Sequence, residues 1–134
     1  MYRFSMSEQM FIQGPVGQIE VFVDYPQGEV KGFAVVTHPH PLQGGTPQHK
    51  VPALLAQMFL ERGCIVYRPS FRGSGQSVGL HDEGHGETDD VLEVIKHARA
   101  AHTTLPFYAG GFSFGAHAVS YTHLRAHATR GNLV

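Results

Sequence analysis

Short apolar runs and helix-forming segments alternate along the chain in a regular order. Residues 18–25 alternate apolar and polar side chains and end at a Pro-Gln-Gly turn, which is typical of a half-buried strand. Residues 8–13 are a candidate for an earlier partner strand. Residues 32–37 are instead continuously apolar, which predicts a strand buried on both faces of a parallel sheet.

Two helices and two more strands are expected after this run. Apolar residues recur at helical spacing within residues 51–61, and Gly63 stands where a C-terminal cap would. Residues 64–68 predict a strand, and residues 87–102 predict a helix with acidic residues at its start and basic residues at its end. Residues 106–110 form another short apolar run. Strands that alternate with helices imply right-handed crossovers and a mainly parallel sheet with flanking helices, so the predicted class is α/β.

Composition narrows the class of protein and its partners. The 134 residues are 42% hydrophobic and 16% charged, as in an ordinary single globular domain. Ten Lys and Arg stand against 11 Asp and Glu, and this balance disfavours nucleic acid as a partner. The single cysteine, Cys64, lies in an apolar run and cannot form an internal disulfide. With no recognisable leader and no apolar stretch near ~18 residues, we expect a cytoplasmic protein without a membrane partner.

Residues 111–115 read Gly-Phe-Ser-Phe-Gly and match the pattern G-x-S-x-G at a predicted strand-to-helix junction. A turn of this kind strains the serine backbone and projects the hydroxyl above the sheet, so the residues two before and two after must be small. Gly111 and Gly115 meet this requirement. The alternative is a glycine-rich turn in which Ser113 only caps a helix. The elements predicted on both sides favour Ser113 as a catalytic nucleophile.

The loop after the buried strand, residues 37–45, reads Thr-His-Pro-His-Pro-Leu-Gln-Gly-Gly. An oxyanion hole needs two backbone N–H donors, one from the residue after the nucleophile, here Phe114, and one from this loop. The two prolines of the loop have no N–H group to donate. The second donor is therefore His40 or Leu42, and we favour His40 because it is closer to the end of the strand.

Four segments together resemble the bacterial α/β-hydrolases related to dienelactone hydrolases and serine aminopeptidases. The segments are residues 38–45, the glycine- and serine-rich loop 71–79, residues 82–87 and the motif around Ser113. The resemblance covers residues from about 15 to about 118 and implies the α/β-hydrolase fold. It also implies a serine esterase or related hydrolase that uses no cofactor and cleaves a small-molecule ester, lactone or amide. In it Ser113 attacks the carbonyl, and residues 72–79 and 82–87 shape the mouth of the site without transferring protons.

The sequence departs from this family after the nucleophile. The fold orders its triad as Ser, then Asp or Glu, then His, with the last two on loops after later strands. No Asp or Glu follows Ser113, and the last acidic residue is Glu93. Of the histidines that follow, at 117, 123 and 127, His117 lies one helical turn from Ser113 and is the alternative base. We therefore expect a hydrolase domain truncated after the nucleophile elbow, and a chain that is inactive by itself.

The last residues resemble something other than a protein family. Residues 119–127, Val-Ser-Tyr-Thr-His-Leu-Arg-Ala-His, are similar to the translation of an adapter used in sequencing libraries, with a departure at Ala128. The alternative is a helix that continues from the motif, since these residues would not break one. We expect residues 1–118 to be the N-terminal half of a single α/β-hydrolase domain and residues 119–134 to be a non-native tail.

Two other functions compete with a serine hydrolase. The chain has ten histidines, and a metal-dependent hydrolase would use an H-x-H pair and further ligands: His38, His40, His49, His81 and His85. Such sites need a carboxylate ligand at matched spacing, and the prolines around the pair fit a rigid turn equally well, so we expect no metal. The other alternative is a non-catalytic binding protein, which would be expected to lose Ser113 or its glycines.

Overall fold

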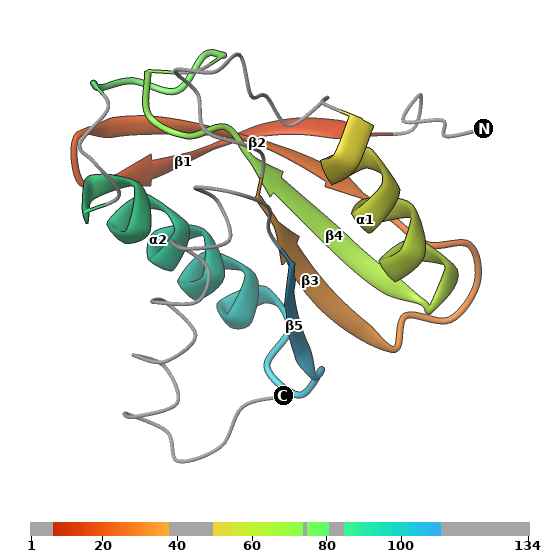
Figure 1. Ribbon diagram of the computed structural model, residues 1–134. Coiled ribbons are helices and arrows are strands. Elements are labelled where there is room, and N and C mark those ends of the chain that lie inside the picture. Colours follow the sequence, from red (N-terminus) through yellow and green to blue (C-terminus); the bar gives the residue numbers. More distant parts are fainter. Residues whose placement is uncertain (1–6, 38–49, 74, 81–84, 111–134) are drawn as a thin grey trace.

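The computed structural model describes residues 7–37, 50–73, 75–80 and 85–110 of the chain (Figure 1). The elements in these ranges follow in the order β1 (Glu8–Gly14), β2 (Gly17–Asp24), β3 (Gly32–Val36), α1 (Lys50–Glu61), β4 (Cys64–Pro69), α2 (His85–Ala101) and β5 (Phe107–Gly110). Each lies within a few residues of the element that the hydrophobic pattern predicts.

The described strands form a five-stranded sheet in the order β1-β2-β4-β3-β5. β1 and β2 are an antiparallel hairpin, and β2 also runs antiparallel to β4. β3 lies between β4 and β5 and is parallel to both. A short turn can join antiparallel strands, whereas parallel strands need a crossover connection, which α1 and α2 provide here. The predicted α/β class is confirmed, with the parallel part made of β4, β3 and β5.

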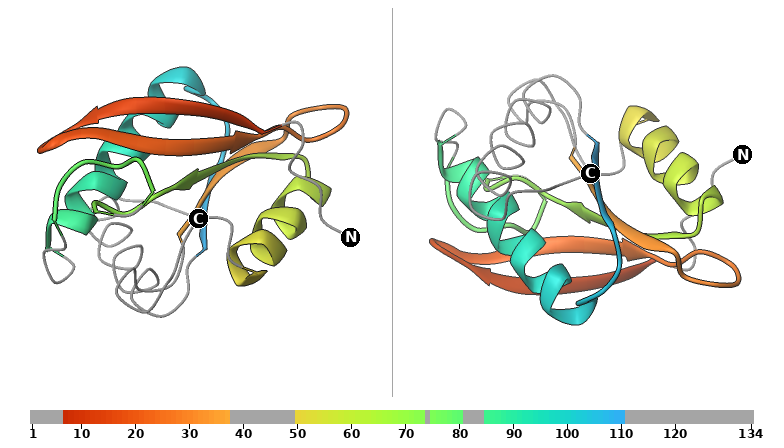
Figure 2. Two further views of the ribbon diagram at one scale, coloured as in Figure 1. Left: turned by 90° about the horizontal axis from the view of Figure 1, so that it is seen from above. Right: turned by 90° about the horizontal axis from the view of Figure 1, so that it is seen from below.

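The helices cover opposite faces of the sheet (Figure 2). Phe33 and Val35 of β3 belong to the core under α2, where Val94 is fully buried. Ala34 and Val36 belong to the smaller core under α1. Successive side chains of a strand point to opposite faces, so a strand covered on both sides is apolar at every position. The prediction of a fully buried strand is confirmed for β3.

The helix ends follow from local chemistry. Gly63 adopts a φ of 86° just beyond α1, and its N–H donates to the carbonyl of Leu60 at 3.0 Å. A residue with a Cβ rarely adopts this left-handed conformation, so the glycine ends α1 as predicted. α2 carries Glu87 in its first turn and Arg99 in its last turn, which suits the helix dipole. In the parts of the chain that the structure describes, no helix is long and apolar enough to cross a membrane.

Candidate functional site

β3 and β5 end side by side at the same edge of the sheet. Val36 of β3 is in register with Gly110 of β5, and the N–H of Thr37 donates to the carbonyl of Gly110 at 3.0 Å. The loop 38–45 and the motif 111–115 therefore begin at adjacent points of the carboxyl edge. In open α/β sheets, ligands bind outside this edge.

The candidate catalytic residues themselves lie outside the described residues. This holds for the nucleophile Ser113, for the two proposed oxyanion donors Phe114 and His40, and for the alternative base His117. Their roles stay predictions. What the structure adds is the position in the sheet from which each segment starts.

Thr37, at the start of the predicted oxyanion loop, has an unsatisfied hydroxyl group. The residue is fully buried, and its Oγ1 has no hydrogen-bond partner, a feature that no other buried side chain shares within the described ranges. A buried polar atom without a partner costs about 1–3 kcal/mol. The sequence signal for this hydroxyl is only a threonine at the end of the apolar run 32–37, and it does not show that the group is unsatisfied. Such an atom at the carboxyl edge is a candidate for contact with a ligand.

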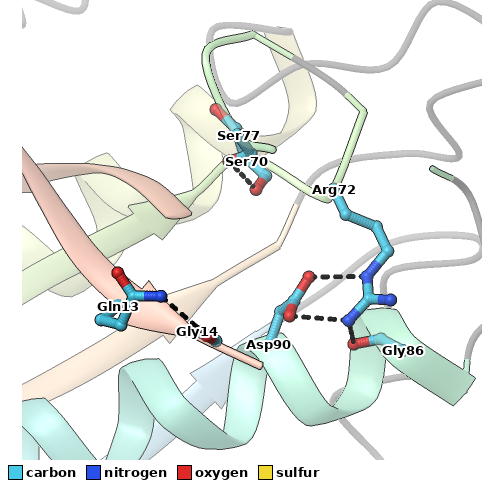
Figure 3. A network of polar contacts seen from close by, with 7 residues as sticks. All are labelled: Gln13, Gly14, Ser70, Arg72, Ser77, Gly86 and Asp90. Atoms are coloured by element: carbon cyan, nitrogen blue, oxygen red, sulfur yellow. Dashed lines mark hydrogen bonds and ion pairs between the residues drawn. The ribbon is translucent and has the colours of Figure 1, made fainter. Parts of the chain in front are cut away.

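Arg72 ties the loop after β4 to the start of α2 (Figure 3). Its Nε and Nη2 atoms donate to the two carboxylate oxygens of Asp90, each at 2.9 Å, and Nη2 also donates to the carbonyl of Gly86 at 2.9 Å. Both partners of this ion pair are buried. Burial raises the pKa of Asp90, and the Arg72 guanidinium opposes that rise. A Cβ at Gly86 would collide with the guanidinium, so this glycine is needed for close approach.

A buried carboxylate on β2 holds the same loop from the other side. Glu20 accepts hydrogen bonds from Ser70 Oγ at 2.9 Å, from the N–H of Gln76 at 3.1 Å and from Gln9 Nε2 at 2.6 Å. Ser77 Oγ accepts from the N–H of Glu20 at 2.9 Å and donates to the carbonyl of Ser70 at 2.7 Å (Figure 3). The loop is thus fixed to β2 by both side-chain and backbone hydrogen bonds.

β2 is more buried than the alternating pattern predicts. Its polar positions Glu20 and Asp24 are each 4% exposed, although a half-buried strand would present them to water. Glu20 is buried by the loop just described. Asp24 accepts from Arg68 Nε of β4 at 2.7 Å, and the guanidinium of Arg68 also lies over the ring of Phe22. The polar face of β2 is therefore covered, because partners from the neighbouring strand and loop satisfy its charges.

Four of the five proposed histidine ligands lie outside the described ranges: His38, His40, His49 and His81. His85 begins α2 and is exposed. Within the described ranges, no group of three His, Cys, Asp or Glu side chains could hold a metal ion.

Comparison with known proteins gives several relatives. No protein-family model matches the sequence. An uncharacterized protein of Rickettsia prowazekii is 34% identical over 112 residues, which is 81% of this chain and 46% of that protein. An α/β serine hydrolase homologue from Coxiella burnetii is 38% identical with a TM-score of 0.83, over 92% of this chain and 58% of that one. XC6422 of Xanthomonas campestris, an α/β serine hydrolase without a lid, is 38% identical with a TM-score of 0.80, over 92% of this chain and 56% of that one.

These comparisons bear on both the fold and the resemblance. The chain is similar in sequence and structure to α/β serine hydrolases over most of its length, and the described elements have the α/β-hydrolase fold in part. The resemblance and the fold class predicted from the sequence are confirmed at this level. The chain spans about half the length of the relatives it matches.

Proposed function

We propose that this chain is the nucleophile-bearing part of a serine hydrolase that cleaves a small-molecule ester, lactone or amide through an acyl-enzyme. The observation that carries the proposal is the adjacent ending of β3 and β5, joined by the hydrogen bond between Thr37 and Gly110. From that point the loop 38–45 and the motif around Ser113 both continue. The 38% identity to α/β serine hydrolases supports the same assignment.

In the proposed reaction, Ser113 Oγ attacks the substrate carbonyl and a tetrahedral intermediate forms. The N–H groups of Phe114 and His40 donate to the oxyanion of this intermediate, which then expels the alcohol or amine and leaves an acyl group on Ser113. Water releases the acid in a second step. No Asp or Glu follows Ser113 in the sequence, so we assign no residue to the acid and none to the base.

Residues 72–79 of the loop after β4 are proposed to form one wall of the mouth of this site. Glu20 and the pair of Arg72 and Asp90 would act there as positioning residues, because they hold the loop without being placed on the reacting atoms. Catalytic geometry must be held to within a fraction of an ångström, which favours a mouth that is anchored on two sides. Residues 1–118 are proposed to be the part of the chain that belongs to this domain.

Acyl transfer to the serine is the sharpest test, because deacylation needs a base that activates water. A hydrolase that lacks triad members still accelerates the reaction about 10³–10⁴-fold over water, through the oxyanion hole and substrate binding. With p-nitrophenyl acetate at pH 8, we therefore expect slow acetylation of Ser113 and little turnover. Intact mass and peptide mapping would locate the acetyl group.

Two controls make this test decisive. Ser113→Ala should abolish the specific adduct, while acetylation of the exposed Lys96 gives the background rate of surface groups in the same sample. If Ser113 is acetylated no faster than exposed hydroxyls elsewhere in the chain, the result would favour a non-catalytic binding protein instead. Rapid turnover that depends on both Ser113 and His117 would show that the chain contains its own base.

A further inference from the structure

A cavity lies at the amino ends of the parallel strands. It has a volume of about 270 Å³ and is lined by Lys31, Phe59, Arg62, Cys64 and Tyr108. Cys64 is the first residue of β4 and is in register with Gly32, the first residue of β3. The candidate catalytic segments leave the sheet at the opposite edge, after Val36 and Gly110. The four residue steps from Gly32 to Val36, at about 3.3 Å each, separate the two edges, so this cavity is not the acyl site.

Two of the five lining residues, Lys31 and Arg62, are cationic. Lys31 and Arg62 come from different loops, which the hydrogen bond from the Lys31 N–H to the Gly63 carbonyl holds together at 2.8 Å. Neither side chain forms an ion pair with a described residue, and none of the lining residues is acidic. Burial raises the pKa of Cys64, so the thiol adds no negative charge near pH 7. The lining therefore favours an anion.

Two other lining residues, Phe59 and Tyr108, are aromatic. The rings of Phe59 and Tyr108 lie 6.2 Å apart between centroids and are tilted by 31°. Tyr108 also packs over Gly32, where an added Cβ would lie 3.0 Å from the ring. The lining thus combines two aromatic rings with two cationic side chains. Pockets for drug-sized ligands usually measure about 300–1,000 Å³, so a space slightly smaller than this range fits a single ring.

We propose that this cavity binds a small aromatic monocarboxylate, with the ring against Phe59 and Tyr108 and the carboxylate toward Lys31 and Arg62. A metal cation would find no acidic ligand in the lining, and a bare inorganic anion would leave the two aromatic rings uncovered. The site is independent of the proposed acyl transfer, because it lies at the opposite edge of the sheet.

The single cysteine of the chain lines this cavity and is only 2% exposed, so its slow modification serves as a reporter for this site. Benzoate is the probe, and the rate at which N-ethylmaleimide modifies Cys64 at pH 8 is followed by intact mass. Bound benzoate should slow the modification with saturation, and benzamide, which has the same shape without the charge, should protect far less. Because exposed ion pairs contribute at most about 1 kcal/mol, Lys31→Met and Arg62→Met should each raise the half-saturating benzoate concentration by up to about fivefold.

Lys96→Met is the matched control, since it removes an exposed lysine from α2 on the other face of the sheet. It should leave protection unchanged, whereas the double variant of Lys31 and Arg62 should lose most of it. As a second readout, benzoate should shift the amide NMR signals of Lys31, Gly63, Cys64 and Tyr108. Equal protection by benzamide, equal sensitivity to Lys96→Met, or shifts confined to other residues would each overturn the proposal.

Discussion

Removal of the Arg72 guanidinium should destabilise the protein far more than removal of an exposed charge. Arg72→Met leaves the carboxylate of Asp90, whose side chain is only 4% exposed, without the two hydrogen bonds that compensate its burial. Breaking one partner of a buried ion pair costs about 3–5 kcal/mol. Since whole domains are stable by only about 5–15 kcal/mol, a loss of this size should be plain in a urea melt.

The loss should depend on pH with a definite sign. Burial already raises the pKa of Asp90 above its ordinary value of 3.8, and loss of the cation should raise it further. The folded variant then holds the Asp90 proton more tightly than the unfolded chain does. The contribution of Asp90 to the stability of the variant is therefore fully present below pH 3.8 and is lost as pH rises through the folded pKa. Urea midpoints of Arg72→Met and the unchanged protein should diverge from pH 4 to pH 7.

Two further variants separate this explanation from a simple loss of packing. Lys96→Met breaks an exposed pair with Glu93 at 3.4 Å and should cost no more than about 0.5 kcal/mol. Adding Asp90→Leu to Arg72→Met removes the orphaned carboxylate and should restore most of the lost stability. The reasoning would be refuted if Arg72→Met cost no more than Lys96→Met at pH 7, or if the second substitution made the loss larger.

Three other outcomes are expected. Thr37→Val should raise the urea midpoint and increase the free energy of unfolding by about 1 kcal/mol, because it removes a buried hydroxyl without a partner. A loss of stability would mean that the hydroxyl is hydrogen-bonded. Burial and the charge of Arg99 lower the pKa of His102, whose Nε2 lies 2.8 Å from the Tyr67 hydroxyl. The contribution of His102 to stability should therefore be lost as pH falls below 6.5. The urea midpoints of His102→Gln should not show this loss. Because β5 is an edge strand of the described sheet, sedimentation velocity should show association that grows with concentration, and a monomer at all concentrations would contradict this.

The order of elements could be read from the sequence because its signals are local. The helical spacing within residues 51–61, the glycine at 63 and the apolar run at 32–37 each depend on a few neighbouring residues, and all three predictions are confirmed. The burial of Glu20 could not be read in this way. Its partners Ser70 and Gln76 are 50 and 56 positions away, and only the crossover through α1 brings them to β2.

The same distinction applies to the candidate site. A motif of five residues predicts Ser113 as the nucleophile, because the constraint on the turn is itself local. The resemblance assigns residues 72–79 to the mouth of the site, but no pattern in the sequence pairs Arg72 with Asp90. That pairing needs β4 and α2 packed in one particular orientation, which is a property of the tertiary structure.

The loop after β4 is anchored at the carboxyl edge of the sheet. Glu20 and Asp90 reach the loop from β2 and from α2, so it is held by elements on two sides. Gly75 adopts a φ of 56°, and a Cβ there would collide with the Glu20 carboxylate, so this position accepts no larger residue without displacing the anchor. A loop fixed by buried charge-assisted hydrogen bonds loses little conformational entropy when a ligand arrives, because its conformation is already set. The loop after β4 is therefore suited to be a rigid wall, and any closure over a substrate would have to come from other segments.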